Sequence, residues 1–264
     1  MKSQILKNKM AIAIALLMAS TLFFSCKKSK VCTPVTVRDT IYDVKDGLIA
    51  YYNFNGGNLN DSSGFGNNIV ENYATPTTDR FGKANNAYLF NGSSCFMRVP
   101  NNNTLTPFNI TIEAIFRIDG YYSGICRGNE ILSKGYPDGA AGNYLMRFQD
   151  ASPCSGSLDT NSVTLLGTSA GIGINSDTSK LHTGKWYQCV YTYDGKKARI
   201  YVDSKLKIEQ NATLTYAPNF KDLFIGRNGS TNYPYYFNGA IDEIRIYNRA
   251  LSANAINQLY NATE

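Results

Sequence analysis

The sequence predicts an all-β fold, either a sandwich or a barrel built from many short strands. From Asp46 onward, short runs rich in Tyr, Ile, Val and Phe recur along the chain. Clusters of Gly, Asn, Asp and Ser separate these runs, and helical periodicity is nearly absent. Closely spaced strands with few helical stretches are typical of sandwiches and barrels. No internal repeat is evident, so we expect residues 46–264 to form one domain.

Twelve runs are expected to form strands, because in each of them apolar and polar residues alternate or apolar residues cluster. In chain order these are residues 47–54, 86–91, 95–100, 110–118, 130–135, 143–148, 162–167, 186–193, 198–203, 205–210, 222–227 and 239–248. Asp194-Gly195 lies between two of them and is typical of a hairpin turn. Trp186 is the only tryptophan of the chain. It begins a strand, and we expect it to pack in the core.

The last strand and the residues after it carry two further signals. A shift in the apolar alternation near Asp242-Glu243 predicts a β-bulge. Ser252 is a suitable N-cap for a short C-terminal helix. The apolar residues of that helix share one face, as expected for a helix that packs against a sheet; they are Ala255, Ile256 and Leu259.

The first 25 residues have the pattern of an export signal. Three lysines precede an apolar run from Met10 to about Phe24. The run is shorter than the roughly 20 apolar residues of a membrane-spanning helix, and it suits a signal peptide. It ends in F-F-S-C, which resembles a bacterial lipobox and predicts lipidation of Cys26. The alternative is an ordinary secretory signal followed by a chance cysteine.

The domain organisation follows from this reading. We expect a signal peptide over residues 1–25, a lipidated cysteine and polar tether over 26–45, and a folded domain over 46–264. The residue after the cysteine is Lys27 and not an acidic residue. In this respect the sequence resembles lipoproteins that are sorted to an outer membrane. The expected location is therefore an outer membrane or the cell surface, reached through a lipid anchor.

Charge argues against a nucleic-acid partner. Cleavage of the signal would remove three lysines and no acid, lowering the formal net charge from +6 to +3. Nucleic-acid surfaces show clustered Lys and Arg, and the only such cluster is the short KKSK sequence of the tether.

Five cysteines follow Cys26, in a compartment that permits disulfides. None of their spacings is C-x-x-C, so a zinc site is not indicated. Cys126 and Cys154 lie in Gly/Ser/Pro-rich segments, and we favour a disulfide between them. Cys189, within an apolar run, is expected to be a buried thiol. The odd number leaves at least one cysteine free or paired with another chain.

Several segments together resemble LamG-like jelly-roll domains of the concanavalin A-like lectin/glucanase superfamily. They are GLIAYYNFNGGNLNDSSGFGNN, FNGSSCFMRVP, ITIEAIF, ILSKG, KWYQCVYTYDGKKARIYVD, LFIGR and FNGAIDEIRIYNRALSANAI, of which the last is the most specific. They occur in the family's order over residues 46–260. The resemblance implies a two-sheet antiparallel jelly-roll sandwich, here with a short C-terminal helix. The family contains lectins, adhesive modules and enzymes, so the fold alone does not give the function.

The resemblance also implies a structural calcium ion, a cation that prefers hard oxygen ligands. Asp242 matches an acidic position that ligates calcium in similar sandwich proteins. Asn53 and Asp61, with Ser63, could complete such a site if the first and last strands are neighbours. In the alternative interpretation, Asp61 forms a turn and Asp242 is a surface ion-pair partner of Arg245.

A pair of catalytic carboxylates is not evident. The E-x-D-x-x-E strand of the superfamily's glucanases is missing from the sequence. Glu113 and Glu130 are the acids well inside strand-like runs of the middle region. We interpret Glu113 as a partly buried acid hydrogen-bonded to a neighbouring strand. His182 is the only histidine of the chain, and it lies in a turn-like segment, KLHTGKW.

Tyrosine-rich loops are the predicted carbohydrate-binding sites, since aromatic faces beside amide and guanidinium donors suit sugars. One loop between two strands offers Arg227, Asn228, Asn232, Tyr233, Tyr235 and Tyr236, and a second cluster is formed by Tyr121 and Tyr122. The alternative is that these tyrosines pack the loops onto the sandwich.

These observations predict a membrane-anchored lipoprotein that captures a polysaccharide or glycan without catalysis. The main alternative is an adhesive or structural module that binds a protein or matrix component. That alternative predicts a contiguous apolar surface patch, whereas sugar binding predicts exposed tyrosines beside amides. A glycan hydrolase or lyase with an unrecognised site is a third possibility.

Overall fold

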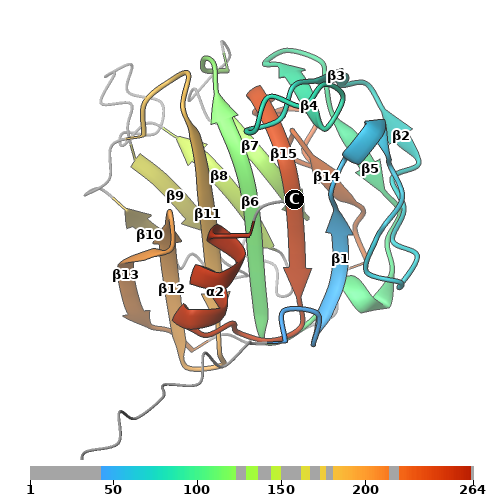
Figure 1. Cartoon of the computed structure of the whole chain (residues 1–264). Helices are drawn as coiled ribbons and strands as arrows, with labels where there is room; N and C mark the ends of the chain where they lie inside the picture. Colours follow the sequence, from blue (N-terminus) through green and yellow to red (C-terminus); the bar gives the residue numbers. More distant parts are fainter. Residues whose placement is uncertain are drawn as a thin grey trace, which may run out of the picture. The chain divides into compact units, whose positions relative to one another are not determined.

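The computed structural model describes residues 43–122, 129–135, 144–149, 162–166, 173–176, 181–213 and 220–262. These residues belong to one compact unit, Tyr42–Glu264. Among the described residues, two antiparallel β-sheets stack face to face and one short α-helix lies outside them (Figure 1). The predicted jelly-roll sandwich is confirmed.

One sheet has eight strands. Seven follow one another in the order β13 (Lys205–Asn211), β12 (Lys197–Val202), β11 (Trp186–Tyr193), β6 (Ile110–Ile118), β15 (Asn238–Tyr247), β4 (Ala87–Asn91) and β3 (Thr75–Thr77). The eighth, β1 (Leu48–Tyr52), also pairs with β15. The first and last strands are therefore neighbours, as expected.

The other sheet has seven strands. Their order is β10 (Gly173–Ser176), β9 (Ser162–Leu166), β8 (Tyr144–Gln149), β7 (Asn129–Lys134), β14 (Leu223–Ile225), β5 (Met97–Val99) and β2 (Glu71–Asn72). All twelve predicted strands are present. The sequence did not predict β2, β3 and β10, which are only two to four residues long.

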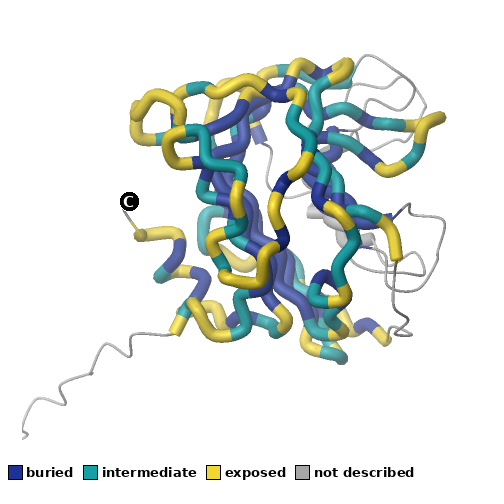
Figure 2. The backbone as a smooth tube through the Cα atoms, turned by 90° about the vertical axis from the view of Figure 1, so that its right-hand side faces the viewer, coloured by how far each residue is buried: buried dark blue, intermediate teal, exposed yellow. Residues whose placement is uncertain are grey.

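The core lies between the two sheets and is built by strand alternation. In β6, Ile112, Ala114 and Phe116 point into the core, whereas Glu113 and Ile115 lie on the outer face. Figure 2 shows buried strands running through the middle of the molecule and exposed residues concentrated in the connections at its ends.

Strand β15 changes partner halfway along its length. Residues 238–241 pair with β4, and residues 244–247 pair with β1. The register with β6 shifts between Ile241 and Glu243, which confirms the predicted bulge. Asp242 lies at this shift, where a bulge locally disrupts the ladder and bends the strand.

Helix α2 (Ala253–Tyr260) packs on the outer face of the eight-stranded sheet, in front of β11 and β12 in Figure 1. The Ser252 hydroxyl accepts a hydrogen bond from the backbone N–H of Ala255, as the capping prediction requires. The three predicted apolar residues of the helix are buried against a sheet patch that consists of Val190, Tyr201 and Tyr247.

Trp186 does not pack in the core, so that expectation is wrong. Strand β11 directs Cys189, Tyr191 and Tyr193 inward. Trp186 is an odd number of positions from each of these residues, and successive side chains of a strand point to opposite faces. The indole is therefore half-buried on the outer face of the eight-stranded sheet.

Some predicted features fall outside the described residues. Cys26, with the signal and most of the tether, is one of them, and Cys126 and Cys154 of the predicted disulfide are others. Within the described part of the chain, Cys95 and Cys189 are free thiols, and Cys189 is fully buried as expected. None of the described helices is long and apolar enough to cross a membrane.

Candidate functional site

The two tyrosine clusters that the sequence singled out lie together in the structure. The ring of Tyr122 is 6.0 Å from that of Tyr235 and 6.3 Å from that of Tyr236, measured between centroids. Tyr233 stacks on Tyr235 at 6.3 Å with an angle of 21° between the ring planes. Two loops far apart in sequence therefore form one aromatic group.

Arg227 connects this group to a second one. Its guanidinium carbon lies 5.5 Å from the ring centroid of Tyr236, 4.9 Å from that of Phe96 and 5.2 Å from that of Phe224. Phe96 in turn contacts Tyr73 at 4.7 Å and Phe224 at 6.0 Å. Such cation–π contacts hold an arginine flat against aromatic faces.

We call the resulting set of side chains the aromatic row. It consists of Tyr73, Phe96, Phe224, Arg227, Tyr236, Tyr122, Tyr235 and Tyr233. Phe224 places the row on the outer face of the seven-stranded sheet, because its neighbours Leu223 and Ile225 point into the core.

Backbone carbonyls fix the Arg227 side chain further. Its Nε donates to the carbonyl of Asn228 at 2.8 Å, and its Nη2 donates to the carbonyl of Ser230 at 3.1 Å. Nη1 makes no hydrogen bond to the described residues. The guanidinium is therefore held in place and keeps donors for a bound molecule.

The exposed ends of the row are Tyr73, which is 58% exposed, and Tyr233, which is 40% exposed. Tyr235 is only 8% exposed, although we predicted it as a contact residue. Its backbone is left-handed, with a φ of 45°, a conformation that bulky residues rarely adopt. We assign Tyr235 the role of supporting the Tyr233 ring.

A buried ion pair lies beneath Tyr235. Arg147 donates through Nε to Glu130 at 2.5 Å, and its guanidinium carbon is 4.4 Å from the Tyr235 ring centroid. Glu130 also accepts a hydrogen bond from the side-chain amide of Asn228 at 3.5 Å. Burial raises the pKa of Glu130, and Arg147 opposes that rise. This pair fixes β7 and β8 under the loop that carries Tyr233.

The remaining predicted sugar-binding residues are less central. Tyr121 packs against the core, and its neighbour Tyr122 is the one that joins the row. Asn232 is exposed at the tip of the loop, where its backbone N–H donates to the Ser230 hydroxyl at 3.2 Å.

Three members of the aromatic row were not predicted from the sequence. The alternation of Leu223, Phe224 and Ile225 contained the signal for Phe224, since two core residues flank a ring that must face outward. Tyr73 and Phe96 gave no such signal, because their contact depends on how β2 and β5 pair.

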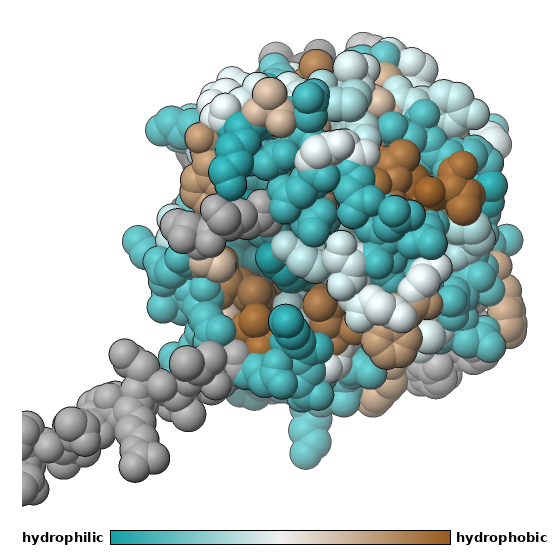
Figure 3. Space-filling model, turned by 45° about the vertical axis from the view of Figure 1, so that its right-hand side comes forward, coloured by the Kyte–Doolittle hydropathy of each residue, from teal (hydrophilic) through white to brown (hydrophobic). Residues whose placement is uncertain are grey.

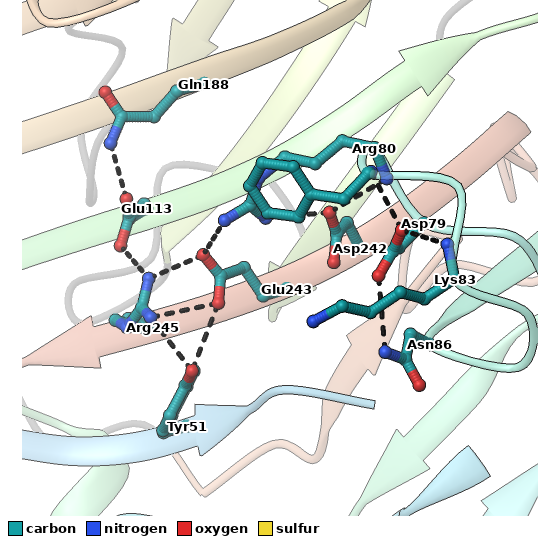
Figure 4. A network of polar contacts seen from close by, with 11 residues as sticks. Tyr51, Asp79, Arg80, Lys83, Asn86, Glu113, Gln188, Asp242, Glu243 and Arg245 are labelled. Carbon is teal, nitrogen blue, oxygen red and sulfur yellow. Dashed lines mark hydrogen bonds and ion pairs between the residues drawn. The ribbon is translucent and has the colours of Figure 1, made fainter. Parts of the chain in front are cut away.

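The outer face of the eight-stranded sheet carries a separate network of buried charges (Figure 4). Arg245 is its centre: Nη1 donates to Glu113 at 2.9 Å, and both terminal nitrogens contact Glu243 at 2.8 and 2.9 Å. Tyr51 accepts from Arg245 at 2.9 Å, and Gln188 donates to Glu113 at 2.6 Å. Glu113 is thus hydrogen-bonded to neighbouring strands, as we interpreted it, and is fully buried.

Arg80 extends this network to the bulge in β15. It donates to Asp242 at 2.7 Å and to Glu243 at 3.3 Å. The ion pair that we considered between Asp242 and Arg245 is therefore wrong; Arg80 is the partner of Asp242. Burial raises the pKa of Asp242 to about 6, against the opposing charge of Arg80.

The predicted calcium ligands differ in how well they suit a cation. The Asp61 carboxylate accepts hydrogen bonds from the backbone N–H groups of Tyr51, Ser63 and Asn67, so it holds a turn, as in our alternative interpretation. Asn53 Oδ1 accepts from the backbone of Asn55.

Asp242 fits a cation better than either residue. Its Oδ1 is buried and has no hydrogen-bond partner among the described residues. Within those residues, no group of three or more His, Cys, Asp and Glu side chains is arranged to hold a metal ion.

The model of the family described as the concanavalin A-like lectin/glucanases superfamily matches residues 91–257. No curated protein matches the chain in sequence.

Comparison with solved structures supports the same fold. Domain 4 of AbnA, a GH43 extracellular arabinanase from Geobacillus stearothermophilus solved with arabinotriose, superposes with a TM-score of 0.60 at 18% identity, over 81% of this chain and 98% of that one.

Two larger proteins contain a similar part. Botulinum neurotoxin type C, whose cell entry depends on two ganglioside molecules, has a TM-score of 0.61 at 16% identity, over 83% of this chain and 51% of that one. Trypanosoma rangeli sialidase has a TM-score of 0.59 at 17% identity, over 81% and 32%. At these identities the likeness concerns the fold.

Proposed function

We propose that this chain, which belongs to the concanavalin A-like lectin/glucanase superfamily, binds carbohydrate through the aromatic row. The observation that carries the proposal is the placement of Arg227 between two groups of rings on one outer face. The similar structures include an arabinanase domain solved with arabinotriose and a toxin whose cell entry involves gangliosides, which supports the proposal.

The chemistry of the row suits a glycan. Faces of aromatic rings pack against the apolar C–H faces of sugars, and Arg227 offers directed donors to hydroxyl or carboxylate oxygens. Because carbonyls, the stacked rings and the Glu130–Arg147 pair already fix these side chains, little ordering cost remains to be met on binding. Non-catalytic capture is the role that we propose.

The surface also bears on the adhesive alternative. On the face drawn in Figure 3, apolar side chains form small groups within a mostly hydrophilic surface. A protein-binding module is expected to show a larger contiguous apolar patch. This view therefore favours sugar binding over adhesion for that face.

A glycan array probed with the full-length protein in detergent tests the proposal. We expect binding to at least one class of polysaccharide, lost in Arg227→Ala and kept in Leu206→Ala. Leu206 is a suitable control because it is 51% exposed and lies on the eight-stranded sheet. An array with no bound glycan would contradict the proposal and favour adhesion.

We also propose that the protein is a lipoprotein displayed at an outer membrane or cell surface, with Cys26 as the acylated residue. The support is the sequence F-F-S-C after a short apolar run. Cys26→Ala is expected to move the protein from the membrane to the soluble fraction. A variant that still partitions with membranes would exclude lipidation at Cys26 as the anchor.

A calcium ion at Asp242 is the last part of the proposal, supported by the buried Oδ1 that has no partner among the described residues. A ligand that binds only the native state raises stability, by about 2.7 kcal/mol at a hundredfold excess over Kd. Calcium should therefore raise the melting temperature of the wild type above that in chelator, and it should not do so in Asp242→Ala. Identical melting curves with and without chelator would exclude a tightly bound ion.

A further inference from the structure

A cavity of about 400 Å³ opens on the outer face of the eight-stranded sheet. It lies between the loop that holds Arg80 and Phe81, the start of β11 at Trp186, and the end of α2 at Tyr260. Ligand pockets in proteins span roughly 300–1,000 Å³. The aromatic row is on the other sheet, so this cavity is separate from the site described above.

Rigid polar groups line one part of the cavity. The Gln188 amide donates to Glu113 at 2.6 Å and accepts from the backbone N–H of Ser204 at 3.2 Å. The Arg80 guanidinium is held by Asp242 and Glu243. The charge of Arg80 is therefore compensated within the network of Figure 4 before any ligand arrives.

Aromatic side chains form the walls. Tyr260 and Phe81 are 46% and 47% exposed, large values for rings of this size. The Arg117 guanidinium carbon lies over the Trp186 ring, 5.3 Å from its centroid, and Arg117 is itself paired with Asp119 at 2.6 Å. Planar walls of this kind suit the face of a sugar ring.

Asp203 supplies a fixed acceptor. It begins the turn between β12 and β13 with a φ of 49°, and its Oδ1 accepts the backbone N–H of Gln188 at 3.0 Å. Its Oδ2 has no hydrogen-bond partner among the described residues. A carboxylate oxygen in this state accepts hydrogen bonds from hydroxyl groups and disfavours another anion.

We infer that this cavity is a second binding site, which takes a neutral sugar unit stacked between Trp186 and Tyr260 and hydrogen-bonded to Asp203. The aromatic walls select a flat, hydroxylated ring. The compensated charge of Arg80 and the carboxylate of Asp203 select against sugars that carry a carboxylate. The site does not depend on the aromatic row.

The chain contains its own reporter for this test, because Trp186 is the only tryptophan. The experiment titrates the full-length protein in detergent with neutral mono- and disaccharides and, separately, with glucuronic acid, and records tryptophan emission. We expect a saturable change with at least one neutral sugar and a much weaker response to glucuronic acid.

Two variants make the test specific. Tyr260→Ala removes an exposed wall and should weaken the titration by about tenfold, as for loss of one stacked ring. Asp203→Asn keeps an oxygen for the Gln188 N–H and tolerates the positive φ, and it should also weaken binding. Tyr233→Ala, in the aromatic row, should leave the titration unchanged while it reduces binding on the glycan array.

Three results would overturn the inference. They are the absence of a saturable change with any neutral sugar, an affinity for glucuronic acid equal to that for neutral sugars, and an unchanged dissociation constant in Tyr260→Ala. A silent glycan array beside a positive titration would contradict the function proposed for the aromatic row and leave this site standing.

Discussion

Arg245 pairs with two buried carboxylates, Glu113 and Glu243, of which Glu243 also contacts Arg80. Glu113 and Glu243 are 0% and 1% exposed, and both contact its guanidinium. Removing one partner of a buried ion pair is costly because the remaining charge stays desolvated. The network of Figure 4 therefore constrains the fold at a face whose neighbouring cavity we propose to be functional.

Arg245→Ala is accordingly expected to lower the free energy of unfolding by about 3–5 kcal/mol. The matched control is Arg199→Ala, which breaks ion pairs with Asp194 and Glu209 at the surface. Exposed pairs contribute about 0.2–1 kcal/mol. Urea unfolding of both variants measures the difference, and equal losses would contradict the role we give to burial.

Asp242 makes stability depend on pH. Its folded pKa is about 6, above its ordinary value of 3.8, chiefly because of burial. Between these values the folded state holds a proton that the unfolded chain has released. Protonation of Asp242 therefore stabilises the folded state fully below pH 3.8, and this stabilisation is lost as the pH rises through 6.

Asp242→Asn mimics the protonated side chain and removes this dependence. In the presence of chelator, the stability of the variant relative to wild type should improve by about 1–3 kcal/mol between pH 4 and pH 7, since one pKa unit corresponds to 1.36 kcal/mol. Denaturant unfolding at both pH values measures it. If the difference in unfolding free energy between Asp242→Asn and wild type is the same at both pH values, burial does not raise the pKa of Asp242.

At the scale of elements, the connection from β14 to β15 determines where Arg227 lies. Gly226 begins that connection with a φ of 79°, and a Cβ there would lie 2.3 Å from the ring of Phe90. Only glycine avoids both the backbone strain and the clash. A Cβ at Gly229, three residues later, would lie 3.6 Å from the nearest atom, which is an ordinary van der Waals contact.

These two glycines form a matched pair of predictions. Gly226→Ala should destabilise the protein by about 1–3 kcal/mol, the usual cost of overpacking. Gly229→Ala should stay within about 0.5 kcal/mol of wild type. Thermal and urea unfolding compare them, and a tolerated Gly226→Ala would show that the connection adjusts more easily than the structure indicates.

The sequence predicted the elements well where alternation or capping was strong. The strands around Ile112 and Ile244, the hairpin at Asp194 and the helix capped by Ser252 were all found, because each depends on local pattern. Strands β2, β3 and β10 were missed, because two to four residues are too few to show a period.

The candidate site was only partly predictable, because long-range pairing creates it. The sequence indicated both tyrosine clusters but not that Tyr122 meets Tyr235, 113 positions further along the chain. The partner of Asp242 was missed for the same reason, since Arg80 lies 162 positions before it. Trp186 was misplaced although the alternation of β11 contained the correct answer.

At the scale of the whole molecule, the sandwich presents two differently built outer faces. The seven-stranded sheet carries the open aromatic row with Arg227 at its centre. The eight-stranded sheet carries helix α2, the buried charge network and the cavity that opens at Trp186. We propose an extended glycan as the ligand of the first face and a single sugar unit as the ligand of the second.

The central claim is that the aromatic row binds carbohydrate, and calorimetric titration with a glycan identified on the array tests it most directly. Wild type is compared with Tyr233→Ala, Tyr73→Ala and the Leu206→Ala control, with melting temperatures measured in parallel. Loss of one stacked ring should weaken binding by about 1–3 kcal/mol, roughly tenfold to a hundredfold in Kd, while the control binds like wild type. If both row variants stay folded and bind as tightly as wild type, the aromatic row is not the glycan site.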